Sequence, residues 1–244
     1  MDVNVANVDN VLIILTCTVK VNHYKHFLHQ TNPTERLELY LKSIKQWLEK
    51  TTFKICVVEN SGYTFPELSE HMEKYGQRFE IITFDECALP HELQHLMYNV
   101  SKGASEMHSI NYAYEHTKFK QDVNFVIKIT GRYFVPLFYE YLNDIDIKNR
   151  TRNIHVHDNP QFIIGLRQHE RDGCVCEIVG IHAFFFKSFF HNDMSNDVGT
   201  FFSHVETLYH NRLKLFDQTK IINLPMFSIE PTQMGGSSCI LTYL

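Results

Sequence analysis

The stretch VLIILTCTV, residues 11–19, is a continuous run of β-branched and other apolar residues. A strand that is apolar at consecutive positions is typical of a parallel sheet buried on both faces. The segment PTERLELYLKSIKQWLEK, residues 33–50, follows with apolar residues at helical spacing, and Pro33 and Thr34 stand at its start. We therefore predict a buried strand followed by an amphipathic helix.

The same alternation continues along the first half of the chain. Because strands that alternate with helices are joined by crossovers, the pattern predicts an α/β fold, with a mainly parallel, Rossmann-like sheet flanked by helices. Segment 85–103 interrupts it and is predicted to be irregular with short helical turns. The further predicted strands are FKICVVENSG (53–62), FEIITF (79–84) and NFVIKIT (124–130), and the further predicted helices are FPELSEHMEKYGQ (65–77) and ASEMHSINYAYEHTKF (104–119).

The second half has a different pattern. QFIIGLRQ (161–168) and CEIVGIHAFFFKS (176–188) are predicted strands close in sequence, with an antiparallel pair as one arrangement. SHVETLYHNRLKLF (203–216) is a predicted helix, and the spacing of Ser203 and Glu206 matches a capping box. We expect a smaller antiparallel portion here, within a single domain that spans residues 1–244.

The composition is ordinary for a soluble globular protein, with 44% hydrophobic and 21% charged residues. A net charge of −5 gives no general attraction to nucleic acid or to anionic membranes. The six cysteines include no C-x-x-C pair, which favours reduced thiols. The N-terminus lacks the basic region of a signal peptide, and VLIIL is too short to span a membrane. We expect a cytoplasmic protein without a membrane span or a nucleic-acid partner.

The segment HELQH, residues 91–95, matches the H-E-x-x-H pattern of zinc hydrolases. In that hypothesis His91 and His95 bind zinc and Glu92 is the base. The extended pattern with a downstream Gly and His is missing, and nothing singles out Glu106 or Glu115 as a third ligand. The chain contains 15 histidines, so a chance match is a real risk. We favour a surface loop or short helix and keep the zinc hydrolase as an alternative.

The segment NFVIKITGRYFVPLFYEYL, residues 124–142, carries a stronger signal. A buried strand ends at Thr130, and Gly131 and Arg132 follow at its carboxyl end. Ligands of open α/β sheets bind outside the carboxyl ends of the strands. A guanidinium is planar and permanently charged, which suits a phosphate. The alternative is that Gly131 only forms a turn and Arg132 is a surface residue.

Four segments occur in the order expected of one family, and a weaker fifth follows. They are ILTCTV (14–19), VVENSG (57–62), SKGASEMHSINYAYEH (101–116), VIKITGRYF (126–134) and GGSSCILTY (235–243). Through these five segments the chain resembles the GT-A-type glycosyltransferases, in particular a group of bacterial and large-virus sugar transferases with a K-x-T-G-R-Y motif. The third segment is similar to the K-G-x-x-E helix of that group, and the fifth to a Gly/Ser-rich loop that closes over the diphosphate.

The resemblance implies transfer of a sugar, hexose or pentose, from a nucleotide-diphosphate sugar to a hydroxyl acceptor. A UDP-sugar donor and a glycan acceptor are the family tendency. Residues 1–142 would bind the nucleotide sugar, and residues 143–244 would bind the acceptor and supply the C-terminal loop. The implied donor site consists of Thr16, Cys17, Thr18, Glu59, Asn60, Ser61, Lys102, Gly103, Thr130, Gly131, Arg132, Gly235, Gly236 and Ser237.

The sequence departs from the family pattern at the metal motif. Thr130, Gly131 and Arg132 stand where GT-A enzymes usually carry D-x-D, so dependence on Mn²⁺ or Mg²⁺ is open and we expect no protein metal site. Arg132, with Lys102, would then stabilise the leaving diphosphate directly. The formal D-x-D at residues 144–146 lies beyond the following helix and is interpreted as a solvated turn.

An inverting transferase also needs a carboxylate that deprotonates the acceptor. Asp197 and Glu206 are the candidates, and the resemblance favours Glu206, whose alternative role is the capping box. His182 is a candidate on the acceptor side, with a buried core histidine as its alternative. Catalytic roles are therefore expected for Glu206, Asp197 and Arg132.

A nucleotidyltransferase and a non-catalytic binding module are two further hypotheses. A nucleotidyltransferase needs a Gly-rich loop after the first strand, and LTCTVKVNHYKHF contains no glycine, which disfavours that class. A non-catalytic nucleotide- or sugar-binding module would bind without turnover. The donor sugar, the acceptor, the stereochemistry and the oligomeric state do not follow from the sequence.

Overall fold

A seven-stranded sheet forms the centre of the protein, with the strand order β3-β2-β1-β4-β6-β5-β7. The computed structural model describes residues 10–26, 28–99, 102–145, 163–170, 173–192 and 205–244. Only β6 runs antiparallel to its neighbours, so the predicted mainly parallel α/β fold is confirmed. The strands are β1 (Val11–Cys17), β2 (Lys54–Glu59), β3 (Phe79–Thr83), β4 (Phe125–Thr130), β5 (Gly165–Glu170), β6 (Gly173–His182) and β7 (Ile221–Leu224).

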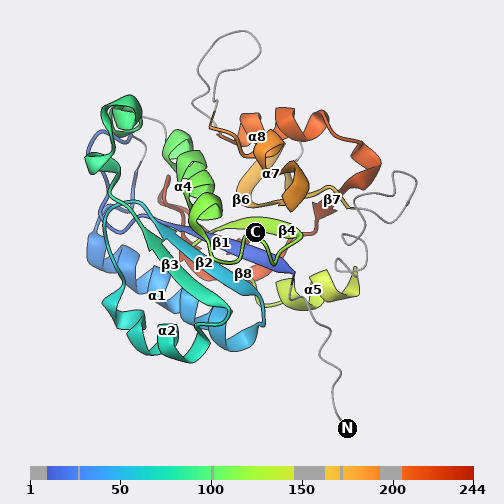
Figure 1. The fold of residues 1–244 in the computed structure, drawn as a ribbon, viewed down its shortest axis with the longest axis horizontal. Coiled ribbons are helices and arrows are strands. Elements are labelled where there is room, and N and C mark those ends of the chain that lie inside the picture. The colour runs from blue at the N-terminus through green and yellow to red at the C-terminus, as the bar shows by residue number, and fades with distance from the viewer. Residues whose placement is uncertain (1–9, 27, 100–101, 146–162, 171–172, 193–204) are drawn as a thin grey trace.

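Helices cover both faces of this sheet (Figure 1). One face carries α1 (Pro33–Lys50), α2 (Ser69–Tyr75) and α5 (Phe138–Asp144). The other carries α4 (Lys102–His116), α7 (Phe186–Phe189) and α8 (Val205–Lys214). The Asn32 side chain caps α1 by accepting hydrogen bonds from the backbone of Thr34 and Glu35, and Pro33 occupies the first turn.

The apolar run that begins β1 is buried because its residues alternate between two cores. Ile13 and Leu15 pack in the core beneath α1, together with Trp47. Leu12 and Ile14 pack in the core beneath α4. A side chain that points to either face of this strand is therefore removed from water, which explains why the run is apolar at consecutive positions.

A small antiparallel sheet of β8 (Ser228–Gln233) and β9 (Ile240–Tyr243) completes the fold. Phe227 and Ile229 pack into the core on the α1 face. The turn between β8 and β9 is closed by the Met234 amide, which donates to the Cys239 carbonyl at 2.9 Å. The Gly235 carbonyl accepts from the His29 amide at 3.1 Å, so the Gly/Ser-rich turn is tied to the loop after β1.

The structure corrects three details of the predicted elements. Residues 183–188 were predicted to extend a strand, but the strand ends at His182 and helical turns follow, η4 (Ala183–Phe185) and α7. The His182 Nδ1 atom accepts from the Phe184 amide at 3.2 Å and so caps the first turn. Strand β7 was not predicted. The helix expected after the strand that ends at Thr130 begins only at Phe138, after an irregular segment and a turn. Asp197, Ser203 and the Asp146 end of the D-x-D segment lie outside the described residues.

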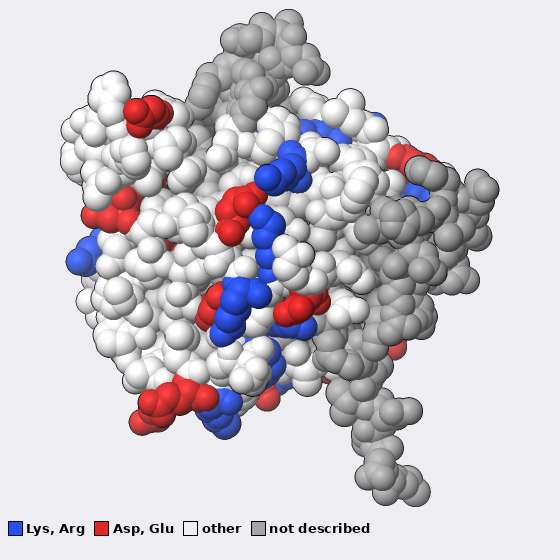
Figure 2. Space-filling view, viewed as in Figure 1, with Lys and Arg blue, Asp and Glu red and all other residues white. Residues whose placement is uncertain are grey.

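Within the described ranges, no helix combines the length and the apolar character needed to cross a membrane. On the face shown in Figure 2, acidic and basic side chains lie intermingled rather than gathered into one large basic area. That distribution agrees with the net charge of −5.

Candidate functional site

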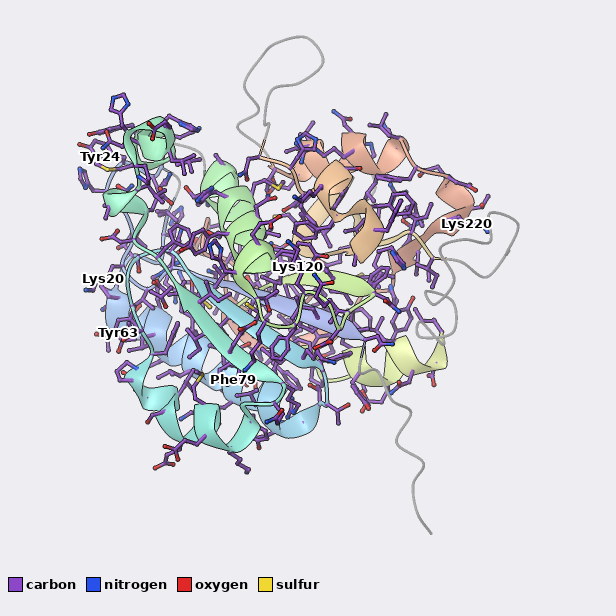
Figure 3. The ribbon with its side chains drawn as sticks, in the orientation of Figure 1. Lys20, Tyr24, Tyr63, Phe79, Lys120 and Lys220 are labelled. Atoms are coloured by element: carbon purple, nitrogen blue, oxygen red, sulfur yellow. The ribbon has the colours of Figure 1, made fainter. Side chains whose placement is uncertain are left out.

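A cleft of about 770 Å³ lies at the carboxyl ends of β1, β2 and β4. These ends meet because β1 pairs in parallel with both β2 and β4. Lys20 and Tyr24, in the loop after β1, lie on this side of the molecule, whereas Lys220 lies at the opposite edge (Figure 3). The residues predicted for the site that line the cleft are Thr16, Cys17, Thr18, Asn60, Ser61, Lys102, Gly103, Thr130, Arg132, Glu206, Gly235, Gly236 and Ser237.

Glu59 ends β2 beneath the cleft rather than in it. The side chain is fully buried and accepts hydrogen bonds from the amides of Val19, Ser61 and Tyr63, each at 2.8 Å. The Ser61 hydroxyl donates to the same carboxylate. Burial raises the pKa of Glu59, and these hydrogen bonds partly offset that rise. The predicted contact between Glu59 and the nucleotide is therefore replaced by a structural role: Glu59 joins the loops after β1 and β2.

A chain of polar contacts continues from these loops to the rim of the cleft. Thr18 Oγ1 donates to Asn60 Oδ1 at 2.6 Å, and Asn60 Nδ2 donates to Glu86 Oε2 at 3.1 Å. Glu86 forms an ion pair of 2.9 Å with Lys25, and both side chains are almost wholly buried. Lys25 Nζ also donates to the carbonyls of Leu96 and Asn99 at 2.6 and 3.0 Å.

The HELQH segment follows Glu86 in the chain and does not itself line the cleft. Residues His91–Leu93 are a 3₁₀ turn and Gln94–Tyr98 a short helix, α3, so the two histidines do not share one regular helix. The side chains of His91, Glu92 and His95 are exposed. No group of three or more His, Cys, Asp or Glu side chains suited to a metal occurs in the part of the chain that the structure describes. The zinc-hydrolase alternative is therefore not favoured.

The floor of the cleft contains a buried ion pair that joins two of the sequence motifs. Lys128, the lysine of K-x-T-G-R-Y, is fully buried, and its Nζ lies 2.7 Å from Oε1 of Glu106, the glutamate of K-G-x-x-E. Lys128 also donates to Thr130 Oγ1 at 3.1 Å and to the Cys176 carbonyl, and Thr16 Oγ1 donates to Glu106 at 3.1 Å. Burial lowers the pKa of Lys128, but Glu106, Cys176 and Glu177 together outweigh that effect, so the pKa is raised overall.

Two glycines near the floor are required by close packing of protein against protein. A Cβ atom on Gly131 would lie 2.5 Å from Cys17 Sγ and 2.8 Å from the Thr16 carbonyl oxygen. A Cβ atom on Gly103 would lie 2.8 Å from the Cβ of Val205 at the start of α8. We expected these glycines to admit a ligand. Instead, Gly131 lets β4 end against β1, and Gly103 lets α4 approach α8.

Of the lysine and arginine side chains that line the cleft, Lys102 and Arg132 are the two predicted for the donor site. The guanidinium of Arg132 packs against Gly235, where a Cβ atom would lie 2.9 Å from one of its terminal nitrogens. The Arg132 Nε atom is buried and has no hydrogen-bond partner among the described residues. Burial lowers the pKa of Lys102, as does the charge of Arg132, whereas Glu206 raises it. Lys102, Arg132 and Glu206 all line the cleft, and the charges of the latter two act on Lys102.

Of the two described residues predicted for the acceptor side, Glu206 lines the cleft and His182 does not. Glu206 lies exposed in the first turn of α8 and accepts a hydrogen bond from Cys176 Sγ at 3.4 Å. His182 lies at the other end of the sheet, paired with Phe125 at the amino end of β4, and does not line the cleft. It is buried, as its core-histidine alternative predicted, and the position gives no support to an acceptor-side role.

Several cleft residues were missed by the sequence interpretation. Glu106 lines the cleft and Lys128 is buried beneath it. Both belong to the motifs K-G-x-x-E and K-x-T-G-R-Y, and this membership could have identified them. Asp85, Glu86 and Glu177 also line the cleft, but no spacing pattern distinguishes them from ordinary surface acids.

Comparison with known proteins gives a likeness in fold only. No protein-family model matches the chain, and no curated protein matches it in sequence. Among solved structures, the glycosyltransferase GlyE of Streptococcus pneumoniae TIGR4 has a TM-score of 0.50 and 9% identity, over 89% of this chain and 45% of that chain. The chain thus spans less than half of the length of GlyE.

Two further structures have a TM-score of 0.45. One, from Desulfovibrio desulfuricans G20, is described as a nucleotide-diphospho-sugar transferase and is 12% identical, over 89% of this chain and 80% of that chain. The other, a cytidylyltransferase from Leptospira borgpetersenii, is 10% identical, over 89% and 76%. The strand order and the likeness to GlyE agree that the chain has a Rossmann-like, GT-A-type α/β fold.

Proposed function

We propose that this protein is a glycosyltransferase that moves a sugar from a nucleotide-diphosphate sugar to a hydroxyl acceptor. The observation that carries the proposal is the cleft at the carboxyl ends of β1, β2 and β4, which brings Lys102 and Arg132 together with the Gly/Ser-rich turn after β8. Ligands of open α/β sheets bind at such strand ends. Two cations that line one cleft suit a diphosphate.

The nucleoside would lie over the ends of β1 and β2. Thr18, Asn60 and Ser61 line this part of the cleft, and their side chains supply hydroxyl and amide groups for a ribose or a base. Glu59 supports them from beneath by holding both loops through its hydrogen bonds. Binding would therefore use a site whose loops are already ordered, which lowers the entropic cost of association.

The diphosphate would lie between Lys102 and Arg132. Lys102 is the first residue of α4, where the helix dipole adds to its positive charge. The turn that contains Gly235 covers the guanidinium of Arg132. As the sugar leaves, negative charge develops on the diphosphate, and fixed cations stabilise that charge. We propose that these side chains supply the charge that D-x-D enzymes obtain through a bound Mn²⁺ or Mg²⁺.

The finer assignments rest on the sequence resemblance. We propose a UDP-sugar as the donor and a hydroxyl of a glycan as the acceptor. The acceptor would approach from the side of β6 and α8, which lie in the second half of the chain and border the cleft at Cys176 and Glu206. A stretch of residues 193–204, which includes Asp197, adjoins this side in sequence and lies outside the described residues.

Thermal unfolding with nucleotides tests the proposal. We expect UDP and UDP-sugars to raise the melting temperature of the wild-type protein, and Arg132→Ala to weaken that effect at least tenfold in ligand concentration. Lys74→Ala, which removes an exposed cation on α2, is the matched control. No stabilisation by UDP, GDP, CDP or their sugars would contradict the proposal.

Turnover then separates an enzyme from a binding module. Release of UDP from the stabilising UDP-sugar, measured with and without EDTA, reports catalysis and metal dependence together. We expect release to persist in EDTA. Binding without release would favour the non-catalytic alternative, and release restored only by Mn²⁺ or Mg²⁺ would contradict the role given to Arg132 and Lys102.

A further inference from the structure

Strand β6 bulges where it borders the cleft. Arg167 of β5 pairs with Val179, whereas the next residue, Gln168, pairs with Val175. Residues 176–178 of β6 therefore have no pairing partners on β5. The ladder between β4 and β6 ends at the pair Ile129 and Ile178. Bulges of this kind redirect side chains and are common beside active sites.

The bulge places Glu177 in the wall of the cleft. Both Cys176 and Glu177 line the cleft, although consecutive strand residues normally point to opposite faces. The Oε2 atom of Glu177 is out of contact with solvent and has no hydrogen-bond partner in the described parts of the chain. A buried carboxylate oxygen without a partner is costly, so its persistence calls for a role.

Charged groups from three elements act on Glu177. Burial raises the pKa of its carboxyl group, Lys128 of β4 lowers it, and Glu106 of α4 and Glu206 of α8 raise it, with a raised pKa as the net result. Tyr133, in the turn after β4, also faces this group electrostatically. A carboxyl group whose pKa is shifted toward neutrality is suited to exchange a proton with a substrate.

The other carboxylate on this side is placed differently. Glu206 is exposed to solvent, lies beside Lys102, and already accepts the Cys176 thiol hydrogen. Of the two, Glu177 has the oxygen that is removed from water and without a partner. A general base needs hydrogen-bonding capacity that the protein does not already fill, and Glu177 retains more of it than Glu206 does.

We infer that Glu177 is the general base that deprotonates the acceptor hydroxyl, and this inference rests on the proposed transferase function. The hydroxyl proton passes to the carboxylate of Glu177, which lines the cleft, while the acceptor oxygen forms a bond to the anomeric carbon. The bond between that carbon and the diphosphate oxygen breaks, and its electron pair leaves with the nucleoside diphosphate beside Lys102 and Arg132. A single displacement of this kind inverts the anomeric configuration.

Hydrolysis of a UDP-sugar, with water as the acceptor, provides the test, because it does not require the natural acceptor. UDP-glucose and UDP-galactose serve as donors, and the variants are Glu177→Gln, Glu206→Gln and the surface control Glu73→Gln. We expect Glu177→Gln to lower kcat by about 10²- to 10⁴-fold. Its KM for the donor and its stabilisation by UDP should stay within about threefold of the wild type, and Glu206→Gln should lose less than tenfold in kcat.

The pH dependence gives a readout that a purely structural role would not change. In the wild type, kcat should fall as the pH decreases through the raised pKa of Glu177, because the protonated carboxyl cannot accept a proton. Glu177→Gln should lack that acidic limb. ¹H NMR of the released sugar, recorded before mutarotation, should show the inverted anomer.

The outcomes separate this inference from the function on which it rests. If UDP stabilises the protein and the donor is hydrolysed, but Glu177→Gln stays within tenfold of the wild type, then only the role of Glu177 is overturned. Retention of configuration overturns that role as well. If no nucleotide stabilises the protein and neither donor is hydrolysed, the proposed function fails and the inference fails with it.

Discussion

Two glutamates near the cleft, Glu59 at the end of β2 and Glu177 in the bulge of β6, differ in how their carboxylates are satisfied. Glu59 receives three backbone amides and a hydroxyl and is fully buried. Glu177 keeps one oxygen without a partner among the described residues, in the wall of the cleft. Burial raises the pKa of both carboxyl groups. Burial alone therefore does not distinguish a carboxylate with a structural role from one suited to proton transfer. The hydrogen-bonding capacity that each carboxylate retains does distinguish them.

The largest effect on stability is expected from Glu106, which holds the floor on the Glu177 side. Glu106→Gln leaves the fully buried Lys128 without its charged partner at 2.7 Å. Removing one member of a buried ion pair should lower the free energy of unfolding by about 3 kcal/mol. Urea denaturation measures the loss, and Glu115→Gln, at an exposed ion pair on the same helix, is the control. Equal stability of the two variants would show that the Lys128 pair is not structural.

Glu59→Gln is the corresponding change on the β2 side. A glutamine side chain has one acceptor oxygen and an amide nitrogen that cannot accept, so part of the backbone amide set loses its partner. We expect a loss of about 2 kcal/mol in the free energy of unfolding. Nucleotide affinity should fall with it, because the loops that contain Thr18 and Ser61 lose their common anchor. A stable variant with normal affinity would contradict the structural role.

Glu177→Gln should not lower the free energy of unfolding at neutral pH, in contrast to Glu59→Gln. In the wild type the folded protein binds a proton at Glu177 at a higher pH than the unfolded chain, since the folded pKa is raised above 4.5. Stability is therefore lost as the pH rises from 4.5 through the folded pKa. The glutamine variant lacks this loss and should be at least as stable as the wild type at pH 7 and above. Melting temperatures across pH 4–9 measure the difference. A variant that is less stable at every pH would show that Glu177, like Glu59, has a structural role.

The smallest effect is expected at HELQH, which does not line the cleft. Lys25 donates to the carbonyls of Leu96 and Asn99, just after this segment, whereas the His91 side chain is exposed. His91→Ala should change the free energy of unfolding by less than about 0.5 kcal/mol. Metal analysis of both proteins accompanies the measurement. Stoichiometric zinc that is lost in the variant would revive the hydrolase alternative.

Local sequence patterns predicted most of the scaffold. The apolar run at residues 11–15 indicated a strand buried on both faces, and Pro33 with the following periodicity indicated α1; both are observed. The continuation of strand pattern into residues 183–188 was misleading, because FFF supplies apolar residues that suit a helical turn packed on β6 equally well. The short strand β7 escaped notice because IINL is too brief to show a period.

The candidate site was predictable only where a pattern tied residues to a strand end. Thr16 and Thr130 end neighbouring parallel strands, so the sheet brings them to one edge. His182 was placed incorrectly with respect to the cleft because β6 runs antiparallel, which takes its carboxyl end to the opposite edge of the sheet. The structure shows one need for glycine at position 131 that the sequence did not reveal, because a Cβ atom there would meet Cys17 of the neighbouring strand.

By itself, the sequence determined the α/β class and the region of the cleft, because strand burial and helix periodicity are local properties that neighbouring residues encode. Only the tertiary structure decided the role of each charged residue. Lys128 became an internal partner of Glu106, Glu59 became a brace for two loops, and Glu177 was turned into the cleft by a bulge. These roles depend on contacts between residues far apart in the chain, and on which hydrogen-bonding positions those contacts leave unfilled.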